Sequence, residues 1–108
     1  MARRKRKNGK ERYNQMMENI KNIPINPVEM WCLYKSFLMY MKPRLEMYRD
    51  GSADKFEDAE SYKEELNEVI WWCDKVINDG PHSKDKEEQK RLDNAKVLFF
   101  NLFYGLWS

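Results

Sequence analysis

The chain has 108 residues, of which 35% are charged, and it contains only four glycines and four prolines. This length allows a single domain with a modest core and excludes a second one, and the composition favours helices. No apolar run reaches the roughly 18 residues that a membrane span requires, so we expect no membrane partner.

Charge is distributed unevenly along the chain, although the net charge is only +2. Residues 1–12 balance to +6, which leaves −4 for the other 96 residues. We predict that residues 1–10 form a flexible basic arm and that residues 11–108 form a single helical domain. The cations of this N-terminal segment are Arg3, Arg4, Lys5, Arg6, Lys7, Lys10 and Arg12.

Such a string of cations can replace the counterions condensed on a nucleic acid, so nucleic acid is the expected partner of the arm. The same string is also compatible with a nuclear address, a contact to an acidic protein patch or a solubilising tail. No aromatic residue stands among the cations, so base stacking by the arm is not expected. The acidic remainder of the chain would stay clear of the phosphates and be free to bind protein.

Helical periodicity begins after the arm. Apolar residues spaced three and four apart predict a short amphipathic helix over residues 11–22. The sequence Asn26-Pro27-Val28-Glu29 combines an N-cap, a proline at the first helical position and a capping-box glutamate, and it predicts a helix over 27–49. Residues 30–41 are apolar nearly all round, which is typical of a central helix. Pro43 should kink or break this helix.

Two further helices are expected. Asp54 and Glu57 repeat the capping box, and a continuous apolar stripe from Phe56 to Ile77 predicts a helix over 54–79 that ends at Gly80-Pro81. The last helix, over 84–104, should open near Ser83 or Asp85. With no alternating strand pattern, the fold class is all-α: a small bundle of three main helices with a short N-terminal helix.

Residues that could carry catalysis are sparse. Cys32 and Cys73 both lie in apolar sequence, which favours reduced, buried thiols in an intracellular, cytoplasmic protein. His82 is the only histidine and cannot build a metal site alone. The glutamates at three- and four-residue spacing over 57–68 fit a solvated helix face better than a di-metal site. We expect no enzyme activity, no cofactor, no metal and no small-molecule substrate.

The tryptophan pair is a candidate for partner binding. Trp71 and Trp72 point about 100° apart on one helix, so both cannot sit at the centre of one buried stripe. Because Trp72 follows Val69 by three residues and precedes Val76 by four, Trp71 should be the more exposed of the two. The alternative is that neighbouring helices cover both rings.

The segment 96–108 is the most apolar run of the chain. A stripe from Ala95 to Leu106 would suffice to close a three-helix core, which leaves other large side chains available to a partner. The partner-binding candidates, with Trp71, are Leu98, Phe99, Leu102, Phe103, Tyr104, Leu106 and Trp107.

The pairs Leu98-Phe99 and Leu102-Phe103 resemble the C-terminal peptides by which proteins dock on DNA sliding clamps. Such a peptide after a small helical body resembles the late-transcription co-activators of tailed phages, which bridge RNA polymerase and the clamp. The resemblance implies that these four residues dock on the clamp and that the body binds polymerase. The sequence departs from that pattern in the extension 106–108 and in lacking acidic residues among the apolar ones.

The leading hypothesis is therefore a non-enzymatic helical adaptor on a nucleic-acid-processing machine, and most specifically a small transcription co-regulator that binds RNA polymerase. A virion or assembly protein that oligomerises and neutralises packaged nucleic acid is the alternative from another class. An inhibitor of a host enzyme would need the same features as the adaptor, an apolar hot spot and a polar rim.

Overall fold

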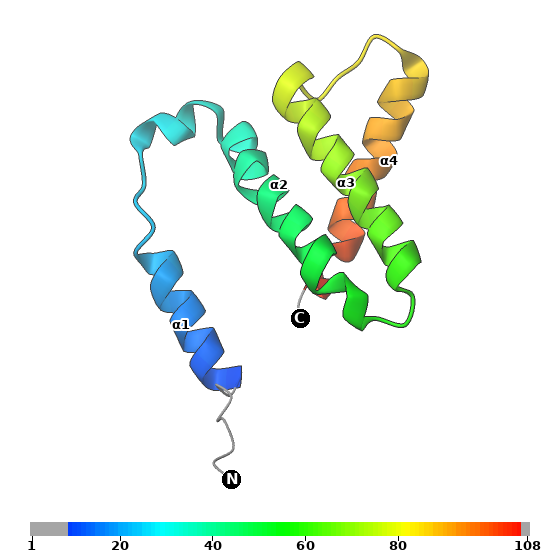
Figure 1. Cartoon of the computed structure of the whole chain (residues 1–108). Coiled ribbons are helices and arrows are strands. Elements are labelled where there is room, and N and C mark those ends of the chain that lie inside the picture. The colour runs from blue at the N-terminus through cyan, green and yellow to red at the C-terminus, as the bar shows by residue number, and fades with distance from the viewer. Residues whose placement is uncertain (1–8, 107–108) are drawn as a thin grey trace. The chain divides into compact units, whose positions relative to one another are not determined.

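The computed structural model describes residues 9–106, which contain four α-helices, three short 3-10 helices and no strand. The all-α fold class is confirmed, and 84% of the structure is helical. The chain divides into two compact units, Met1–Trp31 and Cys32–Ser108. This division falls within the segment 11–108 that the sequence predicts as one domain. Figure 1 gives the order of the helices along the chain.

The first unit holds α1 (Gly9–Lys21), which begins two residues before the predicted start and takes in Lys10 from the predicted arm. None of the residues of α1 is buried. Helices gain most of their stability by packing an apolar face against other elements. Within this unit, α1 has no such packing.

The start signal at Asn26 is correct, but the helix it opens is not the predicted α-helix. The Val28 amide donates to Asn26 Oδ1 at 3.0 Å, and the Asn26 amide donates to Glu29 Oε2 at 2.8 Å, which is the capping-box pattern. The segment that follows is the 3-10 helix η1 (Pro27–Cys32), without a buried residue. The cap satisfies the first donors, but residues 27–32 have no packed face that favours the α-helical form, which the chain adopts only from Leu33 onward.

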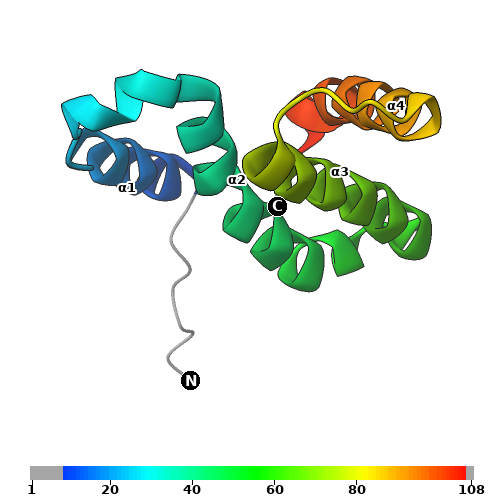
Figure 2. The same cartoon turned by 90° about the horizontal axis from the view of Figure 1, so that it is seen from above.

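The second unit is a three-helix assembly built around α3 (Ala59–Asp79). Helix α3 packs against both α2 (Leu33–Gly51) and α4 (Lys86–Leu102), as Figures 1 and 2 show. The 3-10 helix η2 (Ala53–Lys55) lies between α2 and α3, and η3 (Phe103–Gly105) follows α4. The three main helices of the predicted bundle are therefore present.

The apolar stripe predicted for the third helix is the centre of the core. Most of the buried side chains belong to α3, and Leu66, Val69 and Cys73 are almost fully inaccessible to solvent. The neighbouring helices complete the core from either side. The buried residues are Leu38, Leu45, Ala53, Tyr62, Leu66, Val69, Ile70, Trp72, Cys73, Val76, Leu92, Ala95 and Phe99.

The prediction that α2 is the central helix is wrong. Only Leu38 and Leu45 of α2 are buried, whereas several of its large apolar side chains are exposed. Helix α2 packs along its length against α3 but not against α4. One row of α2 side chains therefore reaches the core, and the other apolar side chains of α2 remain exposed to solvent. The central position belongs to α3.

Pro43 neither breaks α2 nor divides it into two segments, contrary to the prediction. Its ring lies on the exposed side of the helix. The buried side chains of Leu38 and Leu45 hold the helix against the core on both sides of the proline. Packing on either side therefore outweighs the local loss of one helical hydrogen bond.

The boundaries of α3 and α4 follow the local sequence with one exception. Asp54 does not cap α3, which begins at Ala59, because its carboxylate pairs with the Lys63 ammonium group instead. Gly80 ends α3 with a φ of 87°, a conformation that favours glycine. Of the two predicted starting residues, Ser83 and Asp85, it is Asp85 that caps α4, by accepting a hydrogen bond from the Glu87 amide at 3.0 Å.

The residues after α4 are fastened to the core by two tyrosine hydroxyls. Tyr48 of α2 and Tyr62 of α3 each lie 3.3 Å from the Gly105 carbonyl oxygen, and the two hydroxyls lie 3.1 Å apart. Burial and the hydrogen bond to Tyr48 raise the pKa of Tyr62. Leu106 is half-buried against the core. The chain near 105–106 therefore has an internal role, and Leu106 packs on the core as the end of the predicted stripe.

No helix within residues 9–106 combines the length and the apolar character that crossing a membrane would need.

The substitution Tyr62→Phe should lower the free energy of unfolding by about 1 kcal/mol, because it deletes the hydroxyl that joins α2, α3 and the Gly105 carbonyl. Urea denaturation followed by far-ultraviolet circular dichroism measures the change. Tyr13→Phe, which deletes a hydroxyl on exposed α1, is the matched control and should cost nothing. Equal stabilities for the two variants would contradict the assigned role of Tyr62.

The two thiols should react differently with iodoacetamide. Burial raises the pKa of Cys73 from 9.0 to about 11. At pH 8 the fraction of Cys73 in the thiolate form is therefore about a hundredfold smaller than that of a thiol with the ordinary pKa. The Cys73 side chain is also inaccessible to solvent. Cys32 is half-buried rather than buried as predicted. Mass spectrometry should find Cys32 modified in the native protein and both thiols modified in denaturant. Rapid native labelling of Cys73 in a Cys32→Ser variant would show that the core is open.

Candidate protein-binding groove

A groove of about 320 Å³ lies in the second unit between α2 and α4, with α3 beneath it. Its floor consists of core side chains from all three helices. Its walls are aromatic and come from α2 and α4, while the loop after α3 closes one end with Pro81 and His82. The floor residues are Leu38, Trp72, Val76, Leu92 and Phe99, and the wall residues are Tyr34, Phe37 and Phe100.

Phe99 connects the floor to both walls. Its side chain is only 1% exposed, and its ring stacks at a tilt on Trp72 with centroids 5.6 Å apart. Edge-to-face contacts join it to Phe37 across the groove at 6.4 Å and to Phe100 on its own helix at 5.2 Å. Aromatic pairs in this geometry add to the stability that burial gives. Phe99 therefore fixes the positions of rings that are themselves open to solvent.

The walls expose large rings rather than covering them. Phe37 is 45% exposed and Phe100 is 63% exposed, although both border a floor of buried side chains. Exposed aromatic rings beside a preformed apolar hollow are the features of an interaction hot spot. A side chain entering the groove would be covered on three sides.

Two charged residues of α4 border the groove. The Lys96 ammonium group forms no ion pair with a carboxylate within residues 32–106, and the Asp93 carboxylate accepts a hydrogen bond from the Gln89 amide group at 3.0 Å. A mainly apolar surface with a few polar groups at its edge can orient a bound segment.

Ion pairs connect α2 to α3 and α4 to α3 at positions outside the groove. Lys42 of α2 contacts Asp74 of α3 at 3.0 Å, and Arg91 of α4 donates two hydrogen bonds to Glu68 of α3 at 2.6 and 3.2 Å. The hydrogen bond to Asp74 raises the pKa of Lys42, and that to Glu68 raises the pKa of Arg91. These groups are partly exposed, so each pair contributes about 0–1 kcal/mol. They hold α2 and α4 on opposite flanks of α3.

Trp71 lies outside the groove, on the α3–α4 seam. It is half-buried and Trp72 is buried, so the predicted order of exposure is confirmed. The Arg91 guanidinium group lies 3.6 Å from the centre of the Trp71 ring while it pairs with Glu68. The ring face that a partner would use is therefore covered by a cation of the same chain.

The other C-terminal candidates are divided among three environments. Phe99 belongs to the core and has no free surface for a partner, which corrects its assignment as a docking residue. Leu98, Leu102 and Leu106 are half-buried and pack against the core. Phe103 remains 41% exposed and Tyr104 93% exposed. Trp107 lies outside the described residues. The segment therefore does not form one continuous exposed docking peptide.

The N-terminal candidates fall mainly before the described residues. Arg3, Arg4, Lys5, Arg6 and Lys7 lie outside the range 9–106. Lys10 and Arg12 are exposed on α1. Both cations belong to the first unit and are not part of the groove.

Groups suited to catalysis are not gathered in the described part of the chain. Across residues 9–106, no three His, Cys, Asp or Glu side chains are placed to hold a metal ion. His82 and Asp93 both line the groove, but they do not belong to a group of three ligand residues within residues 9–106. The buried Cys73 thiol is held protonated by its raised pKa. The groove can bind apolar side chains, but it presents no activated nucleophile.

The sequence did not identify Tyr34, Phe37 or the groove-facing role of Phe100. The only signal for the α2 wall is the apolar run 30–41, which by itself predicts a helix covered on several sides. An all-round apolar helix is equally compatible with one face in the core and another open to a partner. Only the packing of α2 and α4 on α3 separates these possibilities.

Comparisons of the chain with protein-family models, with curated proteins and with solved structures found no match.

Proposed function

We propose that this chain is a non-enzymatic helical adaptor that binds a partner protein through the groove between α2 and α4. The observation that carries the proposal is the pairing of exposed aromatic walls with a fully buried apolar floor. Aromatic side chains around a desolvated pocket supply a large part of the binding energy in protein interfaces. A helix of the partner, laid between α2 and α4, is the form of ligand that such a groove accepts.

A transcription co-regulator is the narrower form of this proposal. It would require the cations of the N-terminal segment to lie near nucleic acid while the second unit binds RNA polymerase. The exposed Phe103 and Tyr104 could contribute to a second contact, whereas the buried Phe99 could not leave the core without unfolding it. The clamp-docking role inferred by resemblance would therefore rest on fewer residues than the sequence suggested.

An assembly protein remains the second candidate, favoured by one observation. The first unit exposes apolar side chains along α1 and η1 and has no buried residue of its own in those helices. Such a surface could be covered by further copies of the chain. Light scattering separates the two candidates, since a stable closed oligomer supports assembly and a monomer supports the adaptor.

Replacing Phe100 by alanine should weaken partner binding by about thirtyfold, because it removes an exposed aromatic wall and leaves the core intact. The full-length chain would be immobilised, proteins captured from native lysate identified, and the affinity of the captured protein measured by calorimetry. Val97→Ala is the matched control, since Val97 is also exposed on α4 but does not line the groove. A partner bound equally well by both variants would place the interface elsewhere and refute the groove.

A further inference from the structure

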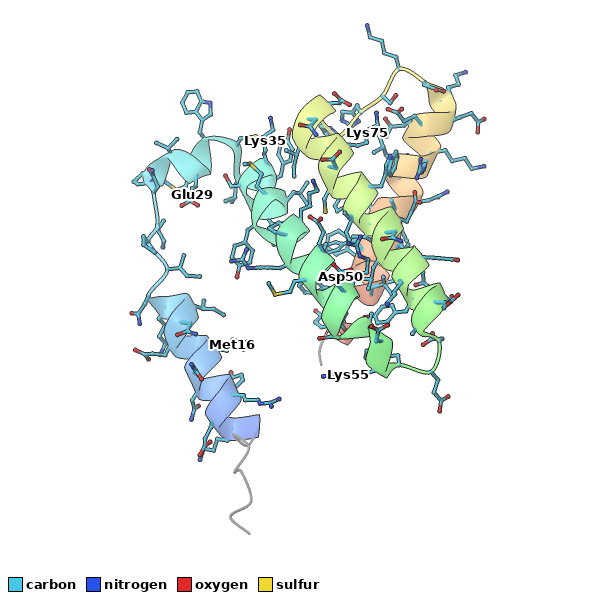
Figure 3. The ribbon with its side chains drawn as sticks, in the orientation of Figure 1. Met16, Glu29, Lys35, Asp50, Lys55 and Lys75 are labelled. Carbon is cyan, nitrogen blue, oxygen red and sulfur yellow. The ribbon has the colours of Figure 1, made fainter. Side chains whose placement is uncertain are left out.

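The first unit presents an apolar surface that no part of that unit covers. Along α1, the side chains Tyr13, Met16, Met17 and Ile20 recur at three- and four-residue spacing and form one stripe (Met16 is labelled in Figure 3). Met17 is half-buried and the other three are exposed. Amphipathic helices in folded domains bury such a stripe in a core. Here α1 has no buried residue.

The segment after α1 enlarges this apolar surface. Val28, Met30 and Trp31 of η1 are exposed, and the Trp31 side chain reaches 93%. Ile23 and Ile25, between the two helices, are exposed as well. A contiguous stretch of chain that exposes this many large apolar residues is typical of a surface that binds another apolar surface.

The charged residues of α1 are sorted by sign around the stripe, with cations on its flanks and carboxylates on the opposite side of the helix. At 100° per residue, Lys10, Arg12 and Lys21 project roughly 70–90° from the centre of the stripe, on its two flanks. Glu11 and Glu18 project from the opposite side of the helix. Five more cations precede α1 in the sequence, at positions 3–7. A surface that covers the stripe would therefore meet cations along its edges and no carboxylate.

This order distinguishes between the polyanions that the cations could bind. The backbone of a nucleic acid offers phosphates but little apolar surface, so the stripe would remain in water. The boundary between anionic headgroups and acyl chains offers both, and a helix lying in its plane places the stripe in the acyl region and flanking lysines and arginines among the headgroups. The two glutamates would then face water.

We propose that residues 9–31, with Lys10, Arg12 and Lys21 beside the apolar stripe of α1, form a peripheral binding site for an anionic lipid surface. The helix lies on the membrane rather than across it, so the site requires no membrane span. This inference goes beyond the groove in the second unit and changes the sequence-based expectation that the chain has no membrane partner. A nucleic acid, the partner expected from the sequence, is the competing outcome, and a DNA duplex serves as its probe.

Cosedimentation of the full-length chain with vesicles tests the proposal. Vesicles of phosphatidylcholine containing phosphatidylglycerol should bind the protein, vesicles of phosphatidylcholine alone should not, and added salt should weaken binding. Replacing Lys10 or Arg12 by glutamine should reduce the affinity roughly fivefold for each cation. A DNA duplex is measured in parallel at the same ionic strength by fluorescence anisotropy.

The decisive variant is Met16→Gln with Ile20→Gln, which removes apolar surface without changing charge. It should lose about tenfold or more of the vesicle affinity and leave any binding to the duplex unchanged. Asn14→Gln with Asn19→Gln, off the stripe on the same helix, is the control and should bind vesicles as the unaltered chain does. Circular dichroism verifies that both variants keep their helices, since glutamine favours helix.

Three results would overturn the lipid site. If the stripe variant binds anionic vesicles as tightly as the unaltered chain, the contact is electrostatic only and the stripe has another partner. If the duplex binds while the vesicles do not, the cations serve nucleic acid. If neither binds, the first unit has no polyanion partner. None of these results affects the groove, because the substitutions lie outside the second unit.

Discussion

The burial of one face of α3 is the interaction on which the second unit depends. Leu66, Val69 and Cys73 lie on that face with almost no exposed surface, and both α2 and α4 pack against it. Burying this surface supplies the main stabilising free energy, while the ion pairs at the seams add little because they are partly exposed. The position of every groove residue follows from this packing, since α2 and α4 are held on opposite flanks of a single helix.

This arrangement also explains why so many aromatic residues are left at the surface. A helix that packs closely along its length on only one other long helix buries mainly one row of side chains, so Tyr34 and Phe37 of α2 remain outside the core although they lie close to it. Phe99 reaches from α4 towards Phe37 and closes the floor, but it does not fill the space above. The groove is therefore a consequence of two flanking helices that pack closely on the same central helix but meet each other mainly through the Phe37–Phe99 ring contact.

The described part of the first unit, unlike the second unit, has no buried core to stabilise its helices. Its helices carry apolar side chains in a regular pattern, but the residues 9–31 contain no buried side chain to hold them. Helix formation there depends on local signals such as the Asn26–Glu29 capping box, which fixes the start of η1. The lipid site proposed for this unit would give these side chains an apolar environment. The sign of the flanking charges then decides which surfaces it can bind.

Local chemistry in the sequence was sufficient to determine the fold class, the stripe of α3, the glycine that ends α3 and the greater exposure of Trp71, because each depends on residues close together in the chain. It narrowed the start of α4 to Ser83 or Asp85. The sequence also located the cations and the amphipathic pattern of α1. Only the tertiary structure decided that α3 rather than α2 is central, that α2 runs through Pro43, and that Phe99 is buried while Phe100 is not. The reason is that burial depends on which helices touch. An apolar run such as 30–41 has the same pattern whether a neighbour covers it or leaves it open, and that outcome is set by contacts between distant residues.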